Sequence, residues 1–262
     1  MKNIIEFKNI CQTYADKKGD KFTLFNNLNL SFEDIPNKGQ FGVIMGESGC
    51  GKSTLLRYLT QLQKPDSGEI LVDGEPLTNK VVIPMVFQNS TASTLEWYSV
   101  LDNVALPLLL KGVNKKEARE KAMEMINIVG LDGHESKYAK HPLLSGGQLQ
   151  RVSIARSLVA NPNIIVMDEP FSALDTTNRR KMQYFLIEIF RRAEAAGYNP
   201  TVLMVTHDER EAVFLADEIF ILGGKPSYVK NNVKIGFSDR NTELRKSQEF
   251  MDAVTHLENL VK

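Results

Sequence analysis

The spacing of apolar residues divides the chain into strand and helix segments. Near the N-terminus, the pattern predicts strands at residues 4–14 and 22–34 on either side of a polar turn. This arrangement indicates a mostly antiparallel β region. A continuous apolar run over residues 40–45 predicts a buried strand that leads into a glycine-rich loop. Further short apolar runs predict strands at residues 69–73, 81–87, 164–168, 201–206 and 218–222.

Helical spacing appears after the glycine-rich loop, where Leu55, Leu56, Leu59 and Leu62 share one face. Residues from about 90 to 160 are mainly helical in pattern. Longer amphipathic helices are predicted around residues 118–129, with Glu117 and Lys121 as an i,i+4 pair and Gly130 as the stop, at 182–193 and at 247–261. The order of segments predicts an α/β core that a helical insertion interrupts.

Composition places the chain among ordinary globular proteins. It has 262 residues, 42% hydrophobic and 24% charged, enough for one large domain or a core with a subdomain. Lys+Arg and Asp+Glu both number 32, so no basic field favours nucleic acid as the main partner. The two cysteines, Cys11 and Cys50, are expected to be reduced thiols.

The ends and the apolar runs argue against a targeting or membrane segment. The first ten residues lack the charged-then-apolar layout of a signal peptide. An apolar stretch such as residues 104–110 is far shorter than the roughly 20 residues of a membrane helix. Work at a membrane would therefore need another chain to supply the span.

A phosphate-binding motif follows the strand at residues 40–45. Its pattern is G-x-x-x-x-G-K-[ST], and it opens a helix, as the motif requires. Glycines let backbone N–H groups turn toward phosphate oxygens, and the helix N-terminus adds partial positive charge. Lys52 is expected to reach the β- and γ-phosphates and Ser53 to ligate Mg²⁺. The motif, called the phosphate loop below, comprises Gly46, Glu47, Ser48, Gly49, Cys50, Gly51, Lys52, Ser53 and Thr54.

The phosphate loop alone indicates only a nucleotide site. A GTPase would be expected to carry an Asn-Lys-x-Asp motif for the base, which the sequence lacks. A small-molecule kinase would need a lid and an acceptor site. The remaining motifs favour neither class.

Two adjacent carboxylates end the apolar strand at residues 164–168. Asp168 is expected in the Mg²⁺ shell beside the phosphate loop, and Glu169 is placed to polarise the attacking water. Neighbouring carboxylates repel each other. A metal ion and a phosphate nearby explain them better than a solvated strand end does.

A second anion site is encoded by Leu144-Ser145-Gly146-Gly147-Gln148, called the signature motif below, before a helix predicted at 149–160. A serine hydroxyl and glycine amides at a helix N-terminus suit a phosphate. With this motif the sequence resembles the ATP-binding cassette (ABC) family, whose signature reads LSGGQ. The resemblance covers nearly the whole chain, and the motifs occur in the family's order.

The resemblance implies a P-loop NTPase (ABC ATPase) core with an N-terminal antiparallel β subdomain and a helical insertion subdomain. We expect a single domain over residues 1–262. Its parts are a β region and RecA-like core at 1–88 and 162–240, the helical subdomain at 89–161 and a C-terminal helix at 241–262. In the family the signature motif of one protomer caps the γ-phosphate held by the other, so a head-to-tail dimer completes both sites.

The resemblance also implies roles for single residues. Tyr14 stands where the family stacks an aromatic ring on adenine, with a core aromatic as the alternative. Gln88 matches the glutamine that touches Mg²⁺ and water. Asp175, in the run 172–175, matches the loop that crosses the dimer interface, and His207 the histidine that contacts the γ-phosphate and orients the water. A lone His at a strand end would otherwise be structural.

Three further residues of these motifs have other predicted roles. Arg151 and Arg156 on the signature helix are expected to make structural salt bridges. Cys50 is interpreted as a small spacer and not as a nucleophile, so bulky thiol reagents should block ATP binding.

Several runs resemble importer cassettes of the nitrate, taurine and aliphatic sulfonate type: EPFSALD at 169–175, the run 205–222, and a tail with Asp239-Arg240 and then residues 247–250. The sequence departs from that type at 94–97, where Thr-Leu-Glu-Trp replaces a frequent Leu-Leu-Pro-Trp. Trp97 and Tyr98 belong either to the groove that docks a transmembrane partner or to the subdomain core. The short stretch after the core leads us to expect no long C-terminal regulatory domain.

The resemblance to importers implies ATP and Mg²⁺ as ligands and three kinds of partner. These are a second copy or a paralogous cassette, integral membrane permease subunits, and a substrate-binding protein outside the cell. Nucleic acid is not an expected partner. The chain would lie in the cytoplasm on the inner face of the membrane. An exporter or lipoprotein-extraction cassette, which the run 104–113 resembles, and a soluble non-transport cassette remain alternatives. The substrate is not encoded in this chain.

Overall fold

The computed structural model describes residues 2–15, 19–35, 38–89, 93–172 and 174–261. Contacts divide the chain into two compact units. The first unit comprises Met1–Ile83 and Thr201–Lys262, and the second unit comprises Pro84–Pro200. The described elements confirm the α/β class.

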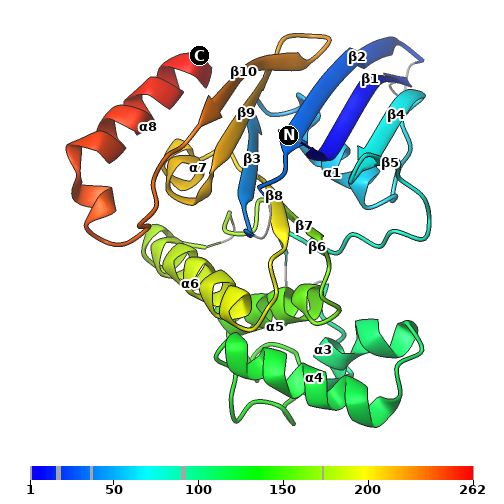
Figure 1. The fold of residues 1–262 in the computed structure, drawn as a ribbon, viewed down its shortest axis with the longest axis vertical. Coiled ribbons are helices and arrows are strands. Elements are labelled where there is room, and N and C mark those ends of the chain that lie inside the picture. The colour runs from blue at the N-terminus through cyan, green and yellow to red at the C-terminus, as the bar shows by residue number, and fades with distance from the viewer. Residues whose placement is uncertain (1, 16–18, 36–37, 90–92, 173, 262) are drawn as a thin grey trace. The chain divides into compact units, whose positions relative to one another are not determined.

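An antiparallel sheet opens the first unit. It contains β1 (Asn3–Ala15), β2 (Lys21–Glu33), β4 (Ser67–Val72) and β5 (Glu75–Pro76) in the order β2-β1-β4-β5. The long hairpin of β1 and β2 (Figure 1) confirms the two strands predicted near the N-terminus. Side chains such as Ile5, Phe7 and Phe32 are buried, while the polar positions between them face outward, as expected of a half-exposed sheet.

A second set of strands in this unit carries the phosphate loop. β10 (Tyr228–Lys234), β9 (Glu218–Gly223), β3 (Phe41–Gly46) and β8 (Thr201–Val205) lie in that order. β3 is parallel to both β8 and β9. These three strands are buried almost throughout, which explains why they appear in the sequence as continuous apolar runs and not as alternation.

Helices of the first unit pack on these strands (Figure 1). α1 (Lys52–Leu59) contacts β3 and β8, α7 (Glu209–Leu215) contacts β3, and α8 (Gln248–Val261) packs on α7 and β9. A short 3₁₀ turn, Leu244–Lys246, precedes α8. The C-terminal helix is confirmed. α7, β5 and β10 were not assigned from the sequence, because they are short or carry many polar residues.

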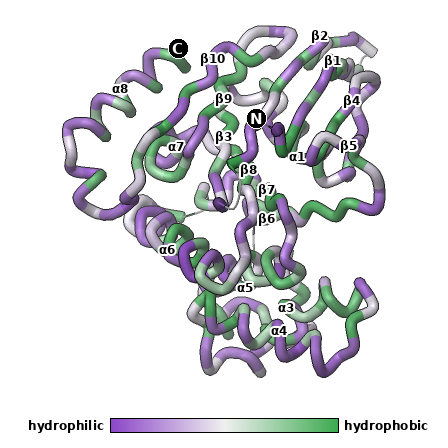
Figure 2. The backbone as a smooth tube through the Cα atoms, viewed as in Figure 1, coloured by the Kyte–Doolittle hydropathy of each residue, from purple (hydrophilic) through white to green (hydrophobic). Residues whose placement is uncertain are grey.

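The second unit is mainly helical. It contains α3 (Val100–Leu110), α4 (Lys115–Ile128), α5 (Gly146–Leu158) and α6 (Thr176–Ala195), with a parallel pair of strands, β6 (Met85–Val86) and β7 (Ile164–Asp168). Figure 2 shows β7 as hydrophobic, whereas α4 alternates between hydrophilic and hydrophobic positions.

Several predicted boundaries were wrong. Leu62, predicted to share a helical face with Leu55, Leu56 and Leu59, lies beyond the end of α1 at Leu59 and is 64% exposed. The strand predicted at 81–87 forms pairs only at Met85–Val86, because Pro84 has no N–H to donate to a ladder. The helix predicted at 149–160 begins earlier, at Gly146, because Ser145 supplies a cap that fixes the first turn. The signature glycines therefore lie inside the helix.

No described helix combines the length and the apolar character needed to cross a membrane.

One buried ion pair fixes the strand that leads into the phosphate loop. Asp217 Oδ2 accepts a hydrogen bond from the Phe41 N–H at 2.8 Å, at the start of β3. Asp217 Oδ1 accepts one from Arg240 Nη2 at 2.6 Å. Side-chain exposure is only 12% for Arg240 and 15% for Asp217. Both carboxylate oxygens therefore have partners, and β3 is tied to the segment before α8.

We predict that Asp217→Ala destabilises the protein by about 3 kcal/mol, because Arg240 is left as a largely buried cation that keeps the Ala216 carbonyl but loses its carboxylate partner. The Phe41 N–H also loses its carboxylate partner. The midpoint of urea unfolding measures the loss. Asp239→Ala, at an exposed neighbouring position, is the control and should change stability by less than about 0.5 kcal/mol. Equal midpoints for the two variants would contradict the proposed importance of the pair.

Candidate functional site

The phosphate loop joins the end of β3 to the start of α1 in the first unit. Gly46 and Gly51 have φ values of 146° and 95°, a backbone that side chains rarely adopt. A Cβ on Gly51 would collide with the ring of Phe25, and one on Gly46 would lie 2.9 Å from Cys50 Sγ. Glycine is required at both positions by backbone shape and by space.

The side chain of Lys52 lies inside this loop. Its Nζ donates to the carbonyl oxygens of Gly46 at 2.8 Å and Glu47 at 2.9 Å, and the residue is buried. Lys52, Ser53 and Thr54 form the first turn of α1, which contains no acidic residue. The helix N-terminus is thus free of a competing carboxylate, and a phosphate group fits the charge of the loop.

Cys50 is buried within the loop. Burial raises the pKa of its thiol, and nearby Lys52 opposes that rise. A cavity of about 230 Å³ adjoins the thiol on the side of the β9–β10 turn. Its lining includes Glu47, Ser48, Tyr228 and Lys230. A buried thiol with a raised pKa is a weak nucleophile, which supports its interpretation as a spacer.

Tyr14 lies half-buried on β1. Its ring centroid is 5.6 Å from that of Phe22 on β2, and its hydroxyl accepts a hydrogen bond from Gln63 Nε2 at 2.5 Å. The ring is therefore held at its hydroxyl end while part of it stays accessible. Phe22, which is 52% exposed, is an aromatic neighbour that the sequence analysis missed, although cross-strand alternation could have indicated it.

His207 follows β8 and is exposed. β8 is parallel to β3, and Ile44 pairs with Val205. The carboxyl ends of the two strands therefore share one edge, so the phosphate loop and the turn with His207 leave the sheet at the same edge. Asp208 fixes this turn as the cap of α7, accepting from the Glu211 N–H at 3.0 Å.

Gln88, Asp168 and Glu169 belong to the second unit. β6 is parallel to β7, and Val86 pairs with Met167. Gln88 thus follows β6 at the edge where Asp168 ends β7 and Glu169 follows it. Glu169 has φ of 43° before a proline, a costly backbone of the kind that concentrates at functional sites.

The signature motif forms the N-terminus of α5. Ser145 Oγ accepts from the Gln148 N–H at 3.3 Å, and Gln148 Oε1 accepts from the Ser145 N–H at 2.9 Å. This reciprocal pair is a capping box. A Cβ on Gly146 would meet no atom within 4 Å, and one on Gly147 would meet only Met182 Sδ, at 3.7 Å. The helix end is open enough for a ligand to approach.

Asp175 caps α6. Its carboxylate accepts from the N–H groups of Thr177 and Asn178, each at 3.1 Å. Hydrogen bonds from Asn178 lower the pKa of Asp175, the one from its backbone N–H more than the one from its side chain. A capping role is therefore evident, while its predicted place at a dimer interface stays a prediction. Ala173 lies outside the described residues.

The salt bridges predicted for Arg151 and Arg156 were wrong as far as the described residues go: these side chains contact an aromatic ring and carbonyl oxygens and not carboxylates. The Arg151 guanidinium lies 3.5 Å from the centroid of the Phe185 ring and donates to the Gly130 carbonyl at 3.3 Å. Arg156 donates to the Ser93 carbonyl at 2.7 Å. A planar guanidinium stacks on aromatic rings and binds carbonyls as readily as it binds carboxylates, which spacing alone does not distinguish.

The segment after Gln88 is partly exposed where it is described: Thr94 is buried, whereas Glu96, Trp97 and Tyr98 are exposed. Trp97 and Tyr98 are 69% and 38% exposed, so the alternative that they belong to the subdomain core was wrong. Ser90, Thr91 and Ala92 lie outside the described residues. A groove for a partner stays a prediction.

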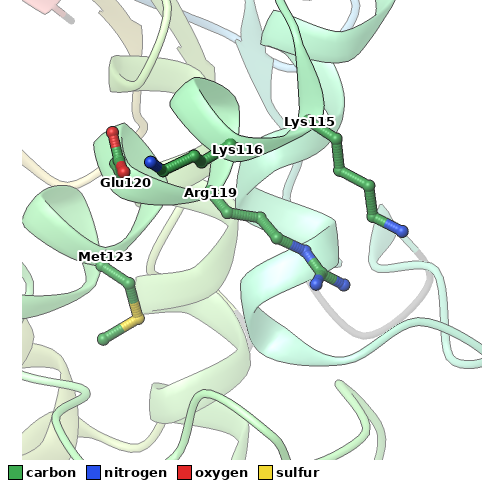
Figure 3. Close-up of a pocket in the computed structure, with 5 residues that line it drawn as sticks. All are labelled: Lys115, Lys116, Arg119, Glu120 and Met123. Carbon is green, nitrogen blue, oxygen red and sulfur yellow. The ribbon is translucent and has the colours of Figure 1, made fainter.

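A separate cavity of about 520 Å³ lies along α4. Figure 3 shows Lys115 and Arg119 extending from one side of this helix, with Glu120 and Met123 further along it. Lys116 completes the lining. None of the predicted site residues belongs to this cavity.

The structure thus brings the predicted residues together in two groups. The phosphate loop, Tyr14 and His207 lie in the first unit, and the other predicted residues lie in the second. The described residues contain no group of three His, Cys, Asp or Glu side chains that could hold a metal ion. Mg²⁺ bound to a nucleotide needs only one or two carboxylates, since phosphate and water supply the remaining ligands.

We predict that Cys50 in the native protein reacts with N-ethylmaleimide more slowly than in the unfolded protein at pH 8, because the raised pKa leaves less thiolate. Mass spectrometry of a Cys11→Ser variant, which retains Cys50 as its one thiol, measures the rate. Once labelled, the loop should lose nucleotide affinity. Normal affinity after stoichiometric labelling of Cys50 would refute the spacer interpretation.

Comparison with known proteins bears on both groups of residues. The ABC transporter family matches residues 25–172. The chain is 34% identical to the nitrate import ATP-binding protein NrtD of Synechocystis sp., over 98% of this chain and 95% of that one. It is 34% identical to the taurine import ATP-binding protein TauB of Pseudomonas aeruginosa, over 86% and 81%.

Among solved structures, the chain is similar to the ATP-binding cassette MJ0796, a dimer in a post-hydrolysis state bound to ADP and Pi. The TM-score is 0.68 at 32% identity, over 89% of this chain and 100% of that one. The span that the family matches, residues 25–172, contains the phosphate loop, the signature motif and the two carboxylates. The chain belongs to the ABC transporter family and is an ATP-binding cassette that hydrolyses ATP.

Proposed function

We propose that this cassette is the nucleotide-binding subunit of a membrane importer and works as a head-to-tail dimer. The observation that carries the proposal is the presence of two open helix N-termini in one chain, at the phosphate loop and at the signature motif. Each offers backbone N–H groups and a partial positive charge to a phosphate. Two copies can therefore share one ATP, with the phosphate loop of one copy facing the signature motif of the other.

In this proposal ATP binds along the first unit. Tyr14 stacks on the adenine, and the phosphate loop surrounds the phosphates, with Lys52 moving its ammonium from the loop carbonyls to the β- and γ-phosphate oxygens. From the second copy, Ser145, Gly146, Gly147 and Gln148 approach the γ-phosphate, and Asp175 crosses the interface. The bound nucleotide thus joins two chains.

Mg²⁺ would be held by Ser53, Gln88 and Asp168, whose hydroxyl, amide and carboxylate oxygens are ligands that this ion accepts. When bound, Mg²⁺ neutralises charge on the phosphate oxygens. Glu169 aligns and polarises the attacking water, and His207 contacts the γ-phosphate and orients that water. Cleavage of the γ-phosphate removes the group that both copies hold, so the dimer opens.

We also propose one cassette domain over residues 1–262, with the helical part at 89–161 as the region that meets the permease. The nitrate and taurine import proteins named above support an importer. The proposed partners are integral membrane permease subunits and an extracellular substrate-binding protein. The cassette would lie on the cytoplasmic face of the membrane.

We predict that Glu169→Gln lowers the ATPase rate by about 10²–10⁴-fold, as expected for loss of a general base, while ATP still binds. Size-exclusion chromatography in MgATP should then show a stable dimer. Glu188→Gln is the matched control, since Glu188 lies on α6 and forms an exposed i,i+4 ion pair with Arg192. A Glu169→Gln protein that hydrolyses ATP at the normal rate would exclude the assigned role.

A second prediction concerns the partners. Tagged Glu169→Gln protein purified in MgATP from its own cell membranes should retain a multi-span membrane protein, which mass spectrometry would identify. Lys52→Ala, which should not bind ATP, is the control for nucleotide-dependent association. Recovery of only soluble proteins or ribosomes, with ATP binding intact, would instead favour a non-transport cassette.

A further inference from the structure

The side chain of Gln148 has a contact on each of its two polar atoms. Its Oε1 accepts from the Ser145 N–H at 2.9 Å, and its Nε2 lies 2.9 Å from Nε2 of His134. We propose that His134 is a positioning residue for ATP capture, acting through Gln148 on the signature motif. This inference rests on the proposed role of that motif at the γ-phosphate of a second copy.

The hydrogen-bond partners fix the tautomer of His134. Its Nδ1 lies 3.2 Å from the carbonyl oxygen of Asp132, which can only accept, so Nδ1 carries the hydrogen. In this neutral tautomer Nε2 is an acceptor. It then receives a hydrogen from Gln148 Nε2, whose amide orientation is in turn fixed by the Ser145 N–H. Each polar atom along the path from Asp132 to Ser145 is therefore fixed as either a hydrogen-bond donor or an acceptor.

The backbone holds the imidazole ring independently of Gln148. The His134 N–H donates to the Leu131 carbonyl at 3.1 Å, and the His134 carbonyl accepts from the Lys137 N–H at 3.0 Å. Glu135 Oε1 accepts from the Gly133 N–H at 2.8 Å within the same turn. The ring is half-buried. His134 is therefore a fixed point against which the amide of Gln148 is oriented.

Hydrogen bonds matter at this helix end because packing is sparse there. A Cβ on Gly146 would have no neighbour within 4 Å, and Ser145 and Gly146 are exposed. The capping box is thus the main restraint on the first turn of α5. If Gln148 turned its amide by 180°, its NH₂ would face the Ser145 N–H, and the box would open.

The box also prepares Ser145 for a phosphate. Its Oγ accepts from the Gln148 N–H, so the hydroxyl hydrogen remains available as a donor to a phosphate oxygen. By fixing Gln148, His134 keeps this donor and the N–H groups of the first turn in place before ATP arrives. Pre-organised donors lower the cost of binding.

Replacing the ring nitrogen tests the proposal. In the otherwise wild-type protein, His134→Phe keeps a planar ring but removes Nε2, the atom that accepts from Gln148. We expect the KM for ATP to rise about threefold to tenfold, the effect of losing one net hydrogen bond, while kcat at saturating ATP changes little. His134→Gln places Oε1 near the position of the imidazole Nε2 and should restore KM. His256→Phe, at an exposed histidine of α8, is the control.

Dimer formation provides a second measurement. In the Glu169→Gln background, the ATP concentration for half-maximal dimerisation should rise by the same factor with His134→Phe and recover with His134→Gln. An unchanged ATP requirement for the His134→Phe protein, with an unchanged KM, would overturn the inference. If Glu169→Gln alone forms no ATP-dependent dimer, the proposed function fails instead.

Nitrogen-15 NMR tests the hydrogen-bond path itself, whatever the dimer does. The ring nitrogens of His134 in the isolated protein at pH 8 should report a single tautomer with hydrogen on Nδ1. Gln148→Ala should shift the Nε2 resonance, because that nitrogen loses its donor. A ring that samples both tautomers, or an Nε2 shift insensitive to Gln148, would also overturn the inference.

Discussion

The inward arrangement of polar groups in the phosphate loop is the constraint on which the first unit depends. Backbone N–H groups must converge on one small volume, and this requires glycine at positions where a side chain would meet β2 or its own loop. The Lys52 ammonium donates hydrogen bonds to two carbonyl oxygens of the same loop. β3 enters the loop from a fixed start, because Asp217 binds its first N–H. Strand, loop and helix therefore form one rigid support for an anion.

In the second unit, the N-terminus of α5 is held in place by different interactions. At the start of α5 the chain has little packing, so side-chain hydrogen bonds replace it. Ser145 and Gln148 satisfy each other's backbone donors, and His134 orients the amide that does so. The phosphate loop is rigid because it is crowded, whereas the signature motif is rigid because its polar atoms have unique partners. The two proposed anion sites thus differ in how easily a nearby substitution disturbs their geometry.

Much of this architecture could be predicted from the sequence, because continuous apolar runs mark strands that are buried on both faces and Gly-Lys-Ser has a defined backbone shape. What could not be predicted depends on contacts between distant residues. The stacking of Arg151 on Phe185 and the contact of His134 with Gln148 join residues that no spacing rule relates. Short elements such as β10, with its alternating polar residues, give weak periodic signals. The length of β6 depended on a missing N–H at Pro84.

The anchoring of Tyr14 has a consequence for which nucleotides the cassette accepts. Its hydroxyl is bound by Gln63, just beyond α1, so the ring is fixed relative to the helix that begins at the phosphate loop. In the proposed complex the ring contacts the face of the base and not its edge, and a face carries little information about base identity. Selectivity among purine nucleotides would then be low, and the relative concentrations of ATP and GTP in the cell would decide which one is consumed.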